Sequence, residues 1–99
     1  MRLEGLDTPV ATVDLDAVRR SIGRVQSYCD DHELAFRPHI KTHKIPAVAH
    51  LQLQAGAVGI TCQKIGEAEV MAAAGIRDIM LAFQELADAG SGIRCRLWD

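Results

Sequence analysis

From residue 35 onward, strand-like and helix-like segments alternate at a nearly constant spacing. Strand starts at 35, 57 and 78 lie 22 and 21 residues apart, and such alternation is typical of βαβ units in a parallel sheet. Pro46 suits the first turn of a helix, and Gly56 and Gly75 suit helix ends. The predicted strands are 35–41, 57–63 and 78–83, and the predicted helices are 45–55 and 66–74. The sequence therefore predicts an α/β fold with a parallel sheet.

The first predicted strand has one polar and one apolar face, because successive side chains of a strand point to opposite sides. The polar face consists of Ala35, Arg37, His39 and Lys41, and the apolar face consists of Phe36, Pro38 and Ile40. Strands of an open parallel sheet are buried on both faces. A polar inner face therefore favours a barrel whose lumen opens onto a solvent-accessible site. A complete barrel needs roughly 250 residues. A chain of 99 residues is therefore expected to form a partial parallel (β/α) barrel, about the first three βα units of one.

The segment before this repeat is expected to form a short strand and then a helix. Residues 8–14 favour the strand, Asp14 is a good helix N-cap, and Asp16 places a carboxylate in the first turn, where it suits the helix dipole. One apolar stripe follows at helical spacing, formed by Leu15, Val18, Ile22 and Val25. At the other end, residues 84–99 show neither the two-residue period of a strand nor the 3.6-residue period of a helix. One or two helical turns are possible at 85–89.

Composition and charge argue against several classes of protein. The net charge of −2 gives no reason to expect binding to nucleic acid or to an anionic membrane, and no apolar run approaches the ~20 residues of a membrane span. The N-terminus has no apolar signal core. The three cysteines, Cys29, Cys62 and Cys95, include no Cys-x-x-Cys pair. We therefore expect a cytoplasmic protein with reduced cysteines.

Lys41 is the favoured candidate for a reactive group. It follows Arg37 and His39 on the polar face, where the first strand should end, and strand ends present the catalytic groups of α/β barrels. Neighbouring cations favour the neutral, nucleophilic form of a lysine. Such a lysine can form a Schiff base with an aldehyde cofactor such as pyridoxal phosphate. Lys44, three residues further on, is the second candidate for the Schiff-base lysine. For both residues the alternative is an ordinary solvent-exposed lysine without a catalytic role.

His39 and His43 are supporting candidates that would orient a cofactor or relay protons. Their i, i+4 spacing suits two metal ligands only on a helix. Here the expected change from strand to helix falls between them, so no metal site is predicted. Thr61 and Gln63 end the second predicted strand at the same edge as Lys41. They could hydrogen-bond a cofactor, and simple capping of the strand end explains them equally well.

Four other titratable side chains are expected to be structural. Glu67 and Glu69 are placed in the first turn of the second helix of the repeat, where a carboxylate compensates the helix dipole. His32 and His50 are expected at surface positions.

Three stretches of the chain resemble a known family. They are Leu6-Asp7-Thr8-Pro9 through Val13-Asp14-Leu15-Asp16, then Arg37-Pro38-His39-Ile40-Lys41-Thr42-His43-Lys44, then Gly59-Ile60-Thr61-Cys62-Gln63-Lys64-Ile65-Gly66-Glu67-Ala68-Glu69. In this order they resemble the N-terminal part of the alanine-racemase-like, fold type III pyridoxal-phosphate enzymes, and most of all the D-threonine aldolase and D-serine dehydratase branch. The resemblance extends over roughly residues 6–83.

The resemblance implies that Lys41 is the Schiff-base lysine at the end of the first barrel strand. It also implies pyridoxal 5'-phosphate as cofactor, a small D-amino acid as substrate, and a homodimer in full-length members. A divalent metal often assists the reaction in this branch. The metal ligands, and the groups that bind the cofactor phosphate, belong to later parts of the family's sequence that this chain lacks.

The expected function follows from these points. Residues 1–99 are interpreted as an N-terminal fragment of a pyridoxal-phosphate-dependent lyase that acts on D-amino acids, inactive in isolation. The irregular tail and the missing strands indicate truncation. Two alternatives stay open: a non-catalytic carrier of pyridoxal phosphate with the same barrel, and a plain α/β interaction module whose basic cluster is a surface patch. The sequence does not distinguish aldolase, dehydratase and racemase chemistry.

Overall fold

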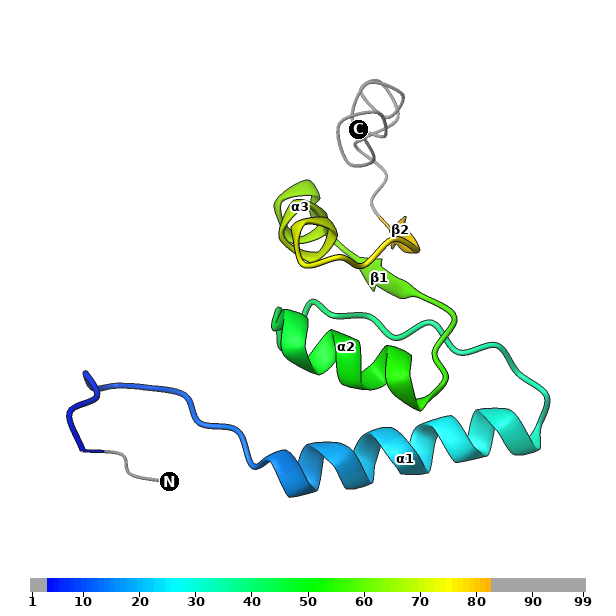
Figure 1. Ribbon diagram of the computed structural model, residues 1–99, viewed down its shortest axis with the longest axis horizontal. Coiled ribbons are helices and arrows are strands. Elements are labelled where there is room, and N and C mark those ends of the chain that lie inside the picture. The colour runs from blue at the N-terminus through cyan, green and yellow to red at the C-terminus, as the bar shows by residue number, and fades with distance from the viewer. Residues whose placement is uncertain (1–3, 83–99) are drawn as a thin grey trace.

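The computed structural model describes residues 4–82 as three helices and a pair of parallel strands (Figure 1). The elements are α1 (Leu15–Asp31), α2 (Pro46–Ala55), β1 (Ile60–Cys62), α3 (Ile65–Ala73) and β2 (Ile79–Leu81). Helix α1 packs against α2, and Figure 1 shows the strands and α3 on the other side of α2. The tail at 84–99, with its expected turns at 85–89, lies outside the described residues.

The two strands pair in parallel, as the strand–helix alternation predicted. Ile60 lies opposite Ile79, and Cys62 lies opposite Leu81. Both strands are shorter than the predicted 57–63 and 78–83. The predicted strand at 35–41 is reduced to one isolated parallel bridge between His39 and Thr61.

Pro38 and Glu67 explain why this first segment pairs so briefly. Around the bridge, the Thr61 N–H donates to Pro38 O at 2.8 Å, and the Ile40 N–H donates to Thr61 O at 3.0 Å. One step toward the N-terminus, a parallel ladder needs a donor at Pro38, which has no N–H. One step toward the C-terminus, it needs the Gln63 N–H, but that group donates to Glu67 Oε1 at 2.9 Å.

Helix α1 begins where the sequence predicted, but the strand expected before it is wrong. Asp14 Oδ1 accepts hydrogen bonds from the backbone N–H of Asp16 at 3.0 Å and of Ala17 at 3.3 Å, which confirms the N-cap. Residues 8–14 are exposed and belong to no strand. No other described segment pairs with them, and an extended segment without a partner leaves its backbone groups to water.

The apolar stripe of α1 is only partly buried. Leu15 and Val25 are exposed, Val18 and Ile22 are half-buried, and the buried positions of the helix are Gln26 and Cys29. The helix therefore packs on α2 through its C-terminal half.

The other two helices match their predicted bounds to within one residue. Pro46 occupies the first turn of α2, as expected. Gly56 follows α2 with φ +126°, and Gly75 lies beyond the end of α3 with φ +93°. Both glycines adopt conformations that side chains disfavour.

The hydrophobic core lies where the helices meet one face of the strands. Ile60 and Cys62 from β1 and Ile40 from the preceding segment are fully buried there. The remaining buried members come from α2, α3 and the loop after α3: Ala49, Ala68, Met71 and Ile76. Burial of Pro38 and Ile40, with Phe36 half-buried, confirms the predicted apolar face of the first segment.

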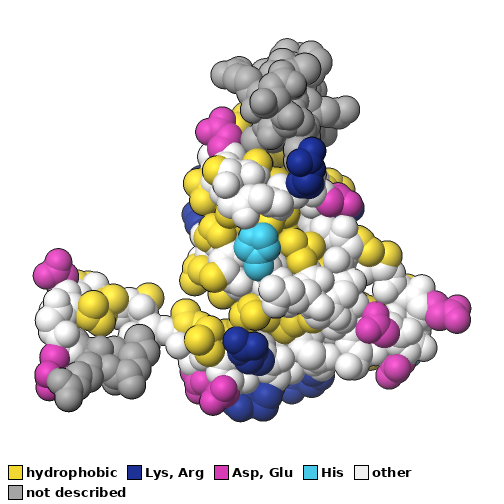
Figure 2. Space-filling view, viewed as in Figure 1, with side chains coloured by type: hydrophobic (Ala, Val, Ile, Leu, Met, Phe, Trp, Pro, Cys, Tyr) yellow, Lys and Arg dark blue, Asp and Glu magenta, His cyan; other side chains and the backbone are white. Residues whose placement is uncertain are grey.

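Some hydrophobic surface stays uncovered. Figure 2 shows exposed hydrophobic side chains on the face that it draws; the large exposed ones in the described part of the chain include Tyr28, Val70 and Met80. None of the helices described between residues 4 and 82 has the length and apolar character needed to cross a bilayer.

Candidate functional site at the strand ends

The register of the strands arranges the polar face in three levels. Because the bridge joins His39 to Thr61, and Thr61 lies opposite Met80, alternation assigns the neighbouring levels. We call this side of the sheet the polar face. From the N-terminal to the C-terminal ends of the strands, its first two levels are Arg37–Gly59–Asp78 and His39–Thr61–Met80. The third level consists of Lys41, Gln63 and Ala82, which follow directly where the bridge and the two strands end.

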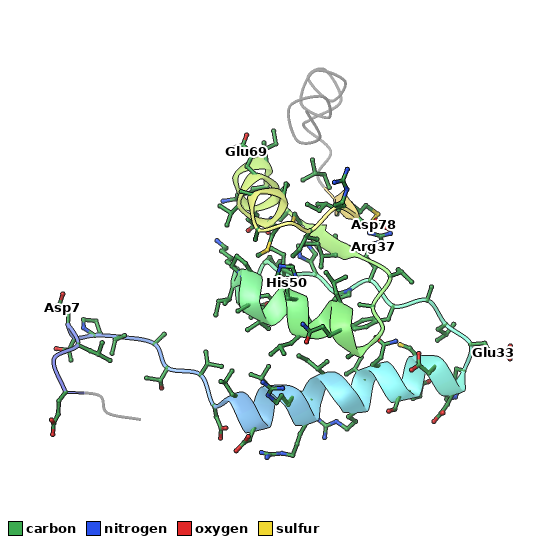
Figure 3. The ribbon with its side chains drawn as sticks, viewed as in Figure 1. Asp7, Glu33, Arg37, His50, Glu69 and Asp78 are labelled. Carbon is green, nitrogen blue, oxygen red and sulfur yellow. The ribbon has the colours of Figure 1, made fainter. Side chains whose placement is uncertain are left out.

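The N-terminal level is closed by an ion pair. Arg37 Nη1 donates to Asp78 Oδ1 at 2.7 Å, and Figure 3 shows the two labelled side chains next to one another. The same nitrogen lies 3.3 Å from the carbonyl oxygen of Ile60 and 3.4 Å from that of Asp78. A Cβ at Gly59 would lie 2.6 Å from Asp78 O and would also clash with the Arg37 guanidinium. Glycine at 59 therefore leaves room for the guanidinium to cross the sheet.

The middle level carries His39. Its Nδ1 accepts a hydrogen bond from the Lys41 backbone N–H at 3.2 Å, so in the neutral ring the proton resides on Nε2. Thr61 opposite is buried at 6% exposure and holds the bridge through its backbone. His39 is thus fixed beside the backbone of Lys41 while its Nε2 makes no hydrogen bond to a described residue.

The C-terminal level presents Lys41 to solvent. The residue is exposed and begins the turn at 41–43. Within the described part of the chain, its ammonium group makes no hydrogen bond and no ion pair. A flexible lysine at the carboxyl end of a parallel strand is available for covalent chemistry with an aldehyde.

His43 is held from both ring nitrogens. Its Nδ1 accepts from the Ile45 N–H at 2.8 Å, and its Nε2 donates to Gln52 Oε1 at 3.2 Å. The first bond satisfies a backbone donor just before α2, and the second reaches along that helix. The geometry makes His43 a support of the turn that carries Lys41.

Glu67 contacts both strand-end turns, which sequence reasoning missed. Its Oε1 accepts from the backbone N–H of Gln63 at 2.9 Å and of Lys64 at 3.3 Å. Its Oε2 lies 3.7 Å from Lys44 Nζ, and its side chain is only 7% exposed. The position of a glutamate at the third residue of a helix is a recognised capping signal, so this part of its role was available from the sequence.

The hydrogen bond from the Gln63 N–H is the main reason that the pKa of Glu67 lies below its ordinary value. Burial opposes this effect, while the Lys64 N–H and the electrostatic interactions with Lys44 and His39 reinforce it. Glu67 is therefore an anion at neutral pH, placed between the two turns.

The remaining expectations for titratable residues are mixed. His32 is exposed, as expected, whereas His50 is half-buried and its Nε2 donates to the Ala74 carbonyl at 2.9 Å. That bond joins α2 to the end of α3, so the expected surface position of His50 is wrong. Glu69 is exposed and lies beyond the first turn, contrary to expectation, because α3 begins at Ile65.

The cysteines in the described residues are unreactive by environment. Cys29 and Cys62 are free and buried. Burial, with a smaller contribution from the negative charge of Glu67, raises the pKa of Cys62 to about 11. The thiol is protonated at neutral pH and is a core side chain, not a nucleophile.

Besides the polar face, residues 4–82 could hold two other kinds of site, a metal-binding cluster and a pocket. No group of three or more His, Cys, Asp or Glu side chains there is arranged to hold a metal ion. An open pocket of about 230 Å³ is lined by Lys44, Gly66, Glu67, Val70 and Met71. Because neither Lys41 nor His39 lines it, this pocket is not the place where the strand-end lysine would react.

The fold and the polar strand ends define an α/β protein with candidate reactive groups at the carboxyl ends of parallel strands. The sequence model of the family described as "Alanine racemase, N-terminal domain" matches residues 13–96. The chain belongs to this family, as its three motifs indicated.

Curated relatives support the same placement. A D-threonine aldolase of Arthrobacter sp. is 41% identical over 87 residues, which cover 88% of this chain and 23% of the aldolase. A D-threo-3-hydroxyaspartate dehydratase of Delftia sp. (strain HT23) is 48% identical over 77 residues, which cover 78% of this chain and 20% of the dehydratase.

A solved structure is similar in its backbone as well. The crystal structure of D-threonine aldolase from Filomicrobium marinum matches with a TM-score of 0.83 and 38% identity, over 92% of this chain and 25% of that one. The chain thus spans about a quarter or less of the length of the relatives that it matches.

Proposed function

We propose that this chain is the N-terminal βα portion of a pyridoxal-phosphate-dependent lyase acting on small D-amino acids, with Lys41 as the residue that holds the cofactor aldehyde. One observation carries the proposal: Lys41 is exposed, lies at the carboxyl end of the first parallel segment, and has no side-chain partner among residues 4–82. The names of the relatives, two aldolases and a dehydratase of D-amino acids, support the reaction class.

The described residues fit one part of the cofactor and leave the rest to other parts of a longer protein. Lys41 would bind the aldehyde. His39 is held beside the Lys41 backbone through Nδ1, and its Nε2 would be available to hydrogen-bond the cofactor. Gln63 is half-buried at the same level, and His43 would support the turn. Bound pyridoxal phosphate would supply an electron sink for a carbanion on the substrate.

The same proposal covers the architecture. The three levels of the polar face would form one wall of a barrel lumen, and the uncovered hydrophobic surface would face the remaining elements. A divalent metal and a homodimer would belong to the complete protein. The chain by itself would bind an aldehyde but complete no turnover.

Borohydride trapping tests the assignment of Lys41. The folded chain and a urea-unfolded control are incubated with limiting pyridoxal phosphate, reduced and digested, and the modified lysines are mapped by mass spectrometry. Selective modification of Lys41 over Lys44 and Lys64 in the folded sample alone is expected. Equal modification in both samples would contradict the proposal and favour a plain interaction module.

A chimaera tests the reaction class. In it, this chain replaces the matching segment of the Arthrobacter D-threonine aldolase, and the matched control carries Lys41→Arg. Turnover of D-threonine by the first protein and none by the second is expected. Cofactor binding without turnover in a folded chimaera would favour the non-catalytic carrier.

A further inference from the structure

The two turns at the C-terminal ends of the strands meet at one carboxylate. Glu67 Oε1 binds the backbone of the turn after β1, through the N–H groups of Gln63 and Lys64. Glu67 Oε2 faces the ammonium group of Lys44, 3.7 Å away, at the end of the turn that carries Lys41. The Glu67 side chain is only 7% exposed, whereas that of Lys44 is 59% exposed, so water screens the pair from the lysine side.

The turn on the Lys41 side is tight. The Lys44 N–H donates to the Ile40 carbonyl at 2.8 Å, and Lys44 has φ +56°, a left-handed conformation that is uncommon for a residue with a side chain. Lys41 lies within this closed turn. The conformation of Lys44, and the direction in which Lys41 leaves the strand, are therefore linked.

We propose that Glu67 is a positioning residue for Lys41, acting through Lys44, and this inference rests on the function proposed above. The carboxylate holds the left-handed turn against the start of α3 and so fixes where the Lys41 ammonium group can reach. Its hydrogen bonds to the backbone of Gln63 and Lys64 fix the end of β1 relative to the turn that carries Lys41.

Helix capping alone does not account for the arrangement. A cap needs only the bonds to Gln63 and Lys64, which Oε1 makes, whereas Oε2 is directed at a residue from a different part of the chain. Glu69 on the same helix provides a contrast, because it is exposed and forms no ion pair with a described residue.

The test combines labelling with a double-mutant cycle. The chain is compared with Glu67→Gln, Lys44→Gln, the double variant and Glu69→Gln as the matched control. The ratio of pyridoxal-phosphate label on Lys41 to that on Lys64 is measured after borohydride reduction. Glutamine at 67 keeps an oxygen that can accept the capping bonds, so the fold is retained, and circular dichroism verifies this.

Each single variant at 67 or 44 is expected to lower the ratio by up to about fivefold, the factor corresponding to the upper end of an exposed ion pair. The double variant is expected to fall no further, because both changes remove one interaction. Glu69→Gln should match the unmodified chain. Additive losses, or an unchanged ratio in Glu67→Gln, would overturn the inference.

Amide hydrogen exchange separates this inference from the function on which it rests. The Lys44 N–H should exchange faster in Glu67→Gln than in the unmodified chain and in Glu69→Gln, with no cofactor present. If the unmodified chain labels its lysines without preference, the proposed function fails. In that case, unchanged exchange of the Lys44 N–H in Glu67→Gln overturns the inference as well. Faster exchange would still show that Glu67 holds the turn at Lys44.

Discussion

The two ends of the polar face are built in opposite ways. At the N-terminal end, Arg37 and Asp78 satisfy one another across Gly59. At the C-terminal end, Lys41 has no partner in the described residues, and the surrounding turns are held instead by Glu67. In α/β barrels, the N-terminal ends of the strands serve stability and the C-terminal ends serve chemistry. In this chain the ion pair of Arg37 and Asp78 fits the stabilising end, and the lysine proposed to hold the cofactor, Lys41, lies at the opposite end.

The largest expected effect separates the ends by function. Lys41→Arg should abolish the selective labelling of the folded chain by pyridoxal phosphate. The label that remains should be spread over the other lysines, as in the unfolded control. The substitution should change the free energy of unfolding by less than about 0.5 kcal/mol, because Lys41 is exposed and its ammonium group has no partner between residues 4 and 82, and such side chains contribute little to folding. Label counts by mass spectrometry and urea unfolding check the two halves. Lys64→Arg is the control and should keep the selective label.

At the opposite end, Gly59→Ala should destabilise the chain by about 2 kcal/mol, the usual cost of overpacking. The new Cβ would lie 2.6 Å from the backbone oxygen of Asp78, and a backbone atom cannot rotate away. Gly23→Ala in α1 is the matched control, because no described atom lies within 4 Å of its Cβ position, apart from its chain neighbours and the backbone of its own helix. That change should stabilise by up to about 1 kcal/mol. Urea denaturation that ranks the two variants in the reverse order would contradict the assignment.

Asp78→Asn should have a smaller effect, about 1 kcal/mol or less. Asp78 is 60% exposed while Arg37 is 27% exposed, and exposed ion pairs contribute modestly. The loss should shrink as salt is raised, since screening weakens the pair in the unmodified chain. Thermal unfolding at low and high ionic strength measures this. An equal loss at both would show that the backbone contacts of Arg37, and not the pair, matter.

The last expected effect concerns the pH dependence of stability. The pKa of Glu67 is lower in the folded chain than its ordinary value of 4.5, so the folded state binds the proton less readily than the unfolded state. The stabilisation by the ionised carboxylate is therefore complete above pH 4.5 and is lost as pH falls through the folded value. Glu67→Gln should be less stable than the unmodified chain by up to about 1 kcal/mol at neutral pH, and the difference should narrow below pH 4.5. A difference that widens in acid would refute this account.

The sequence predicted what depends on local chemistry. Asp14 as a cap, Pro46 in a first turn and Gly56 at a helix end each follow from the residue type and its immediate neighbours, and all three were confirmed. The parallel pairing followed from the regular alternation. Residues 8–14 were misjudged because strand-like composition does not supply a partner strand.

The parts that the sequence did not reveal depend on pairs that are distant in the chain. Arg37 and Asp78 are separated by 41 residues, and nothing local marks them as partners. Pro38 shortens the first strand only because of the register in which His39 meets Thr61. Glu67 was recognised as a helix-start residue, but its approach to Lys44 needed the three-dimensional arrangement.

Gly59 has a consequence for how the strands find their alignment during folding. A slip of β1 by one residue would bring Val58 or Ile60 beneath the Arg37 guanidinium, and either side chain would occupy the space that the guanidinium needs. A slip also exchanges the two faces of a strand, which would expose the fully buried Ile60. The absence of a Cβ at Gly59 therefore favours one alignment of β1 with its neighbours, and the same alignment sets which residues stand at the C-terminal ends.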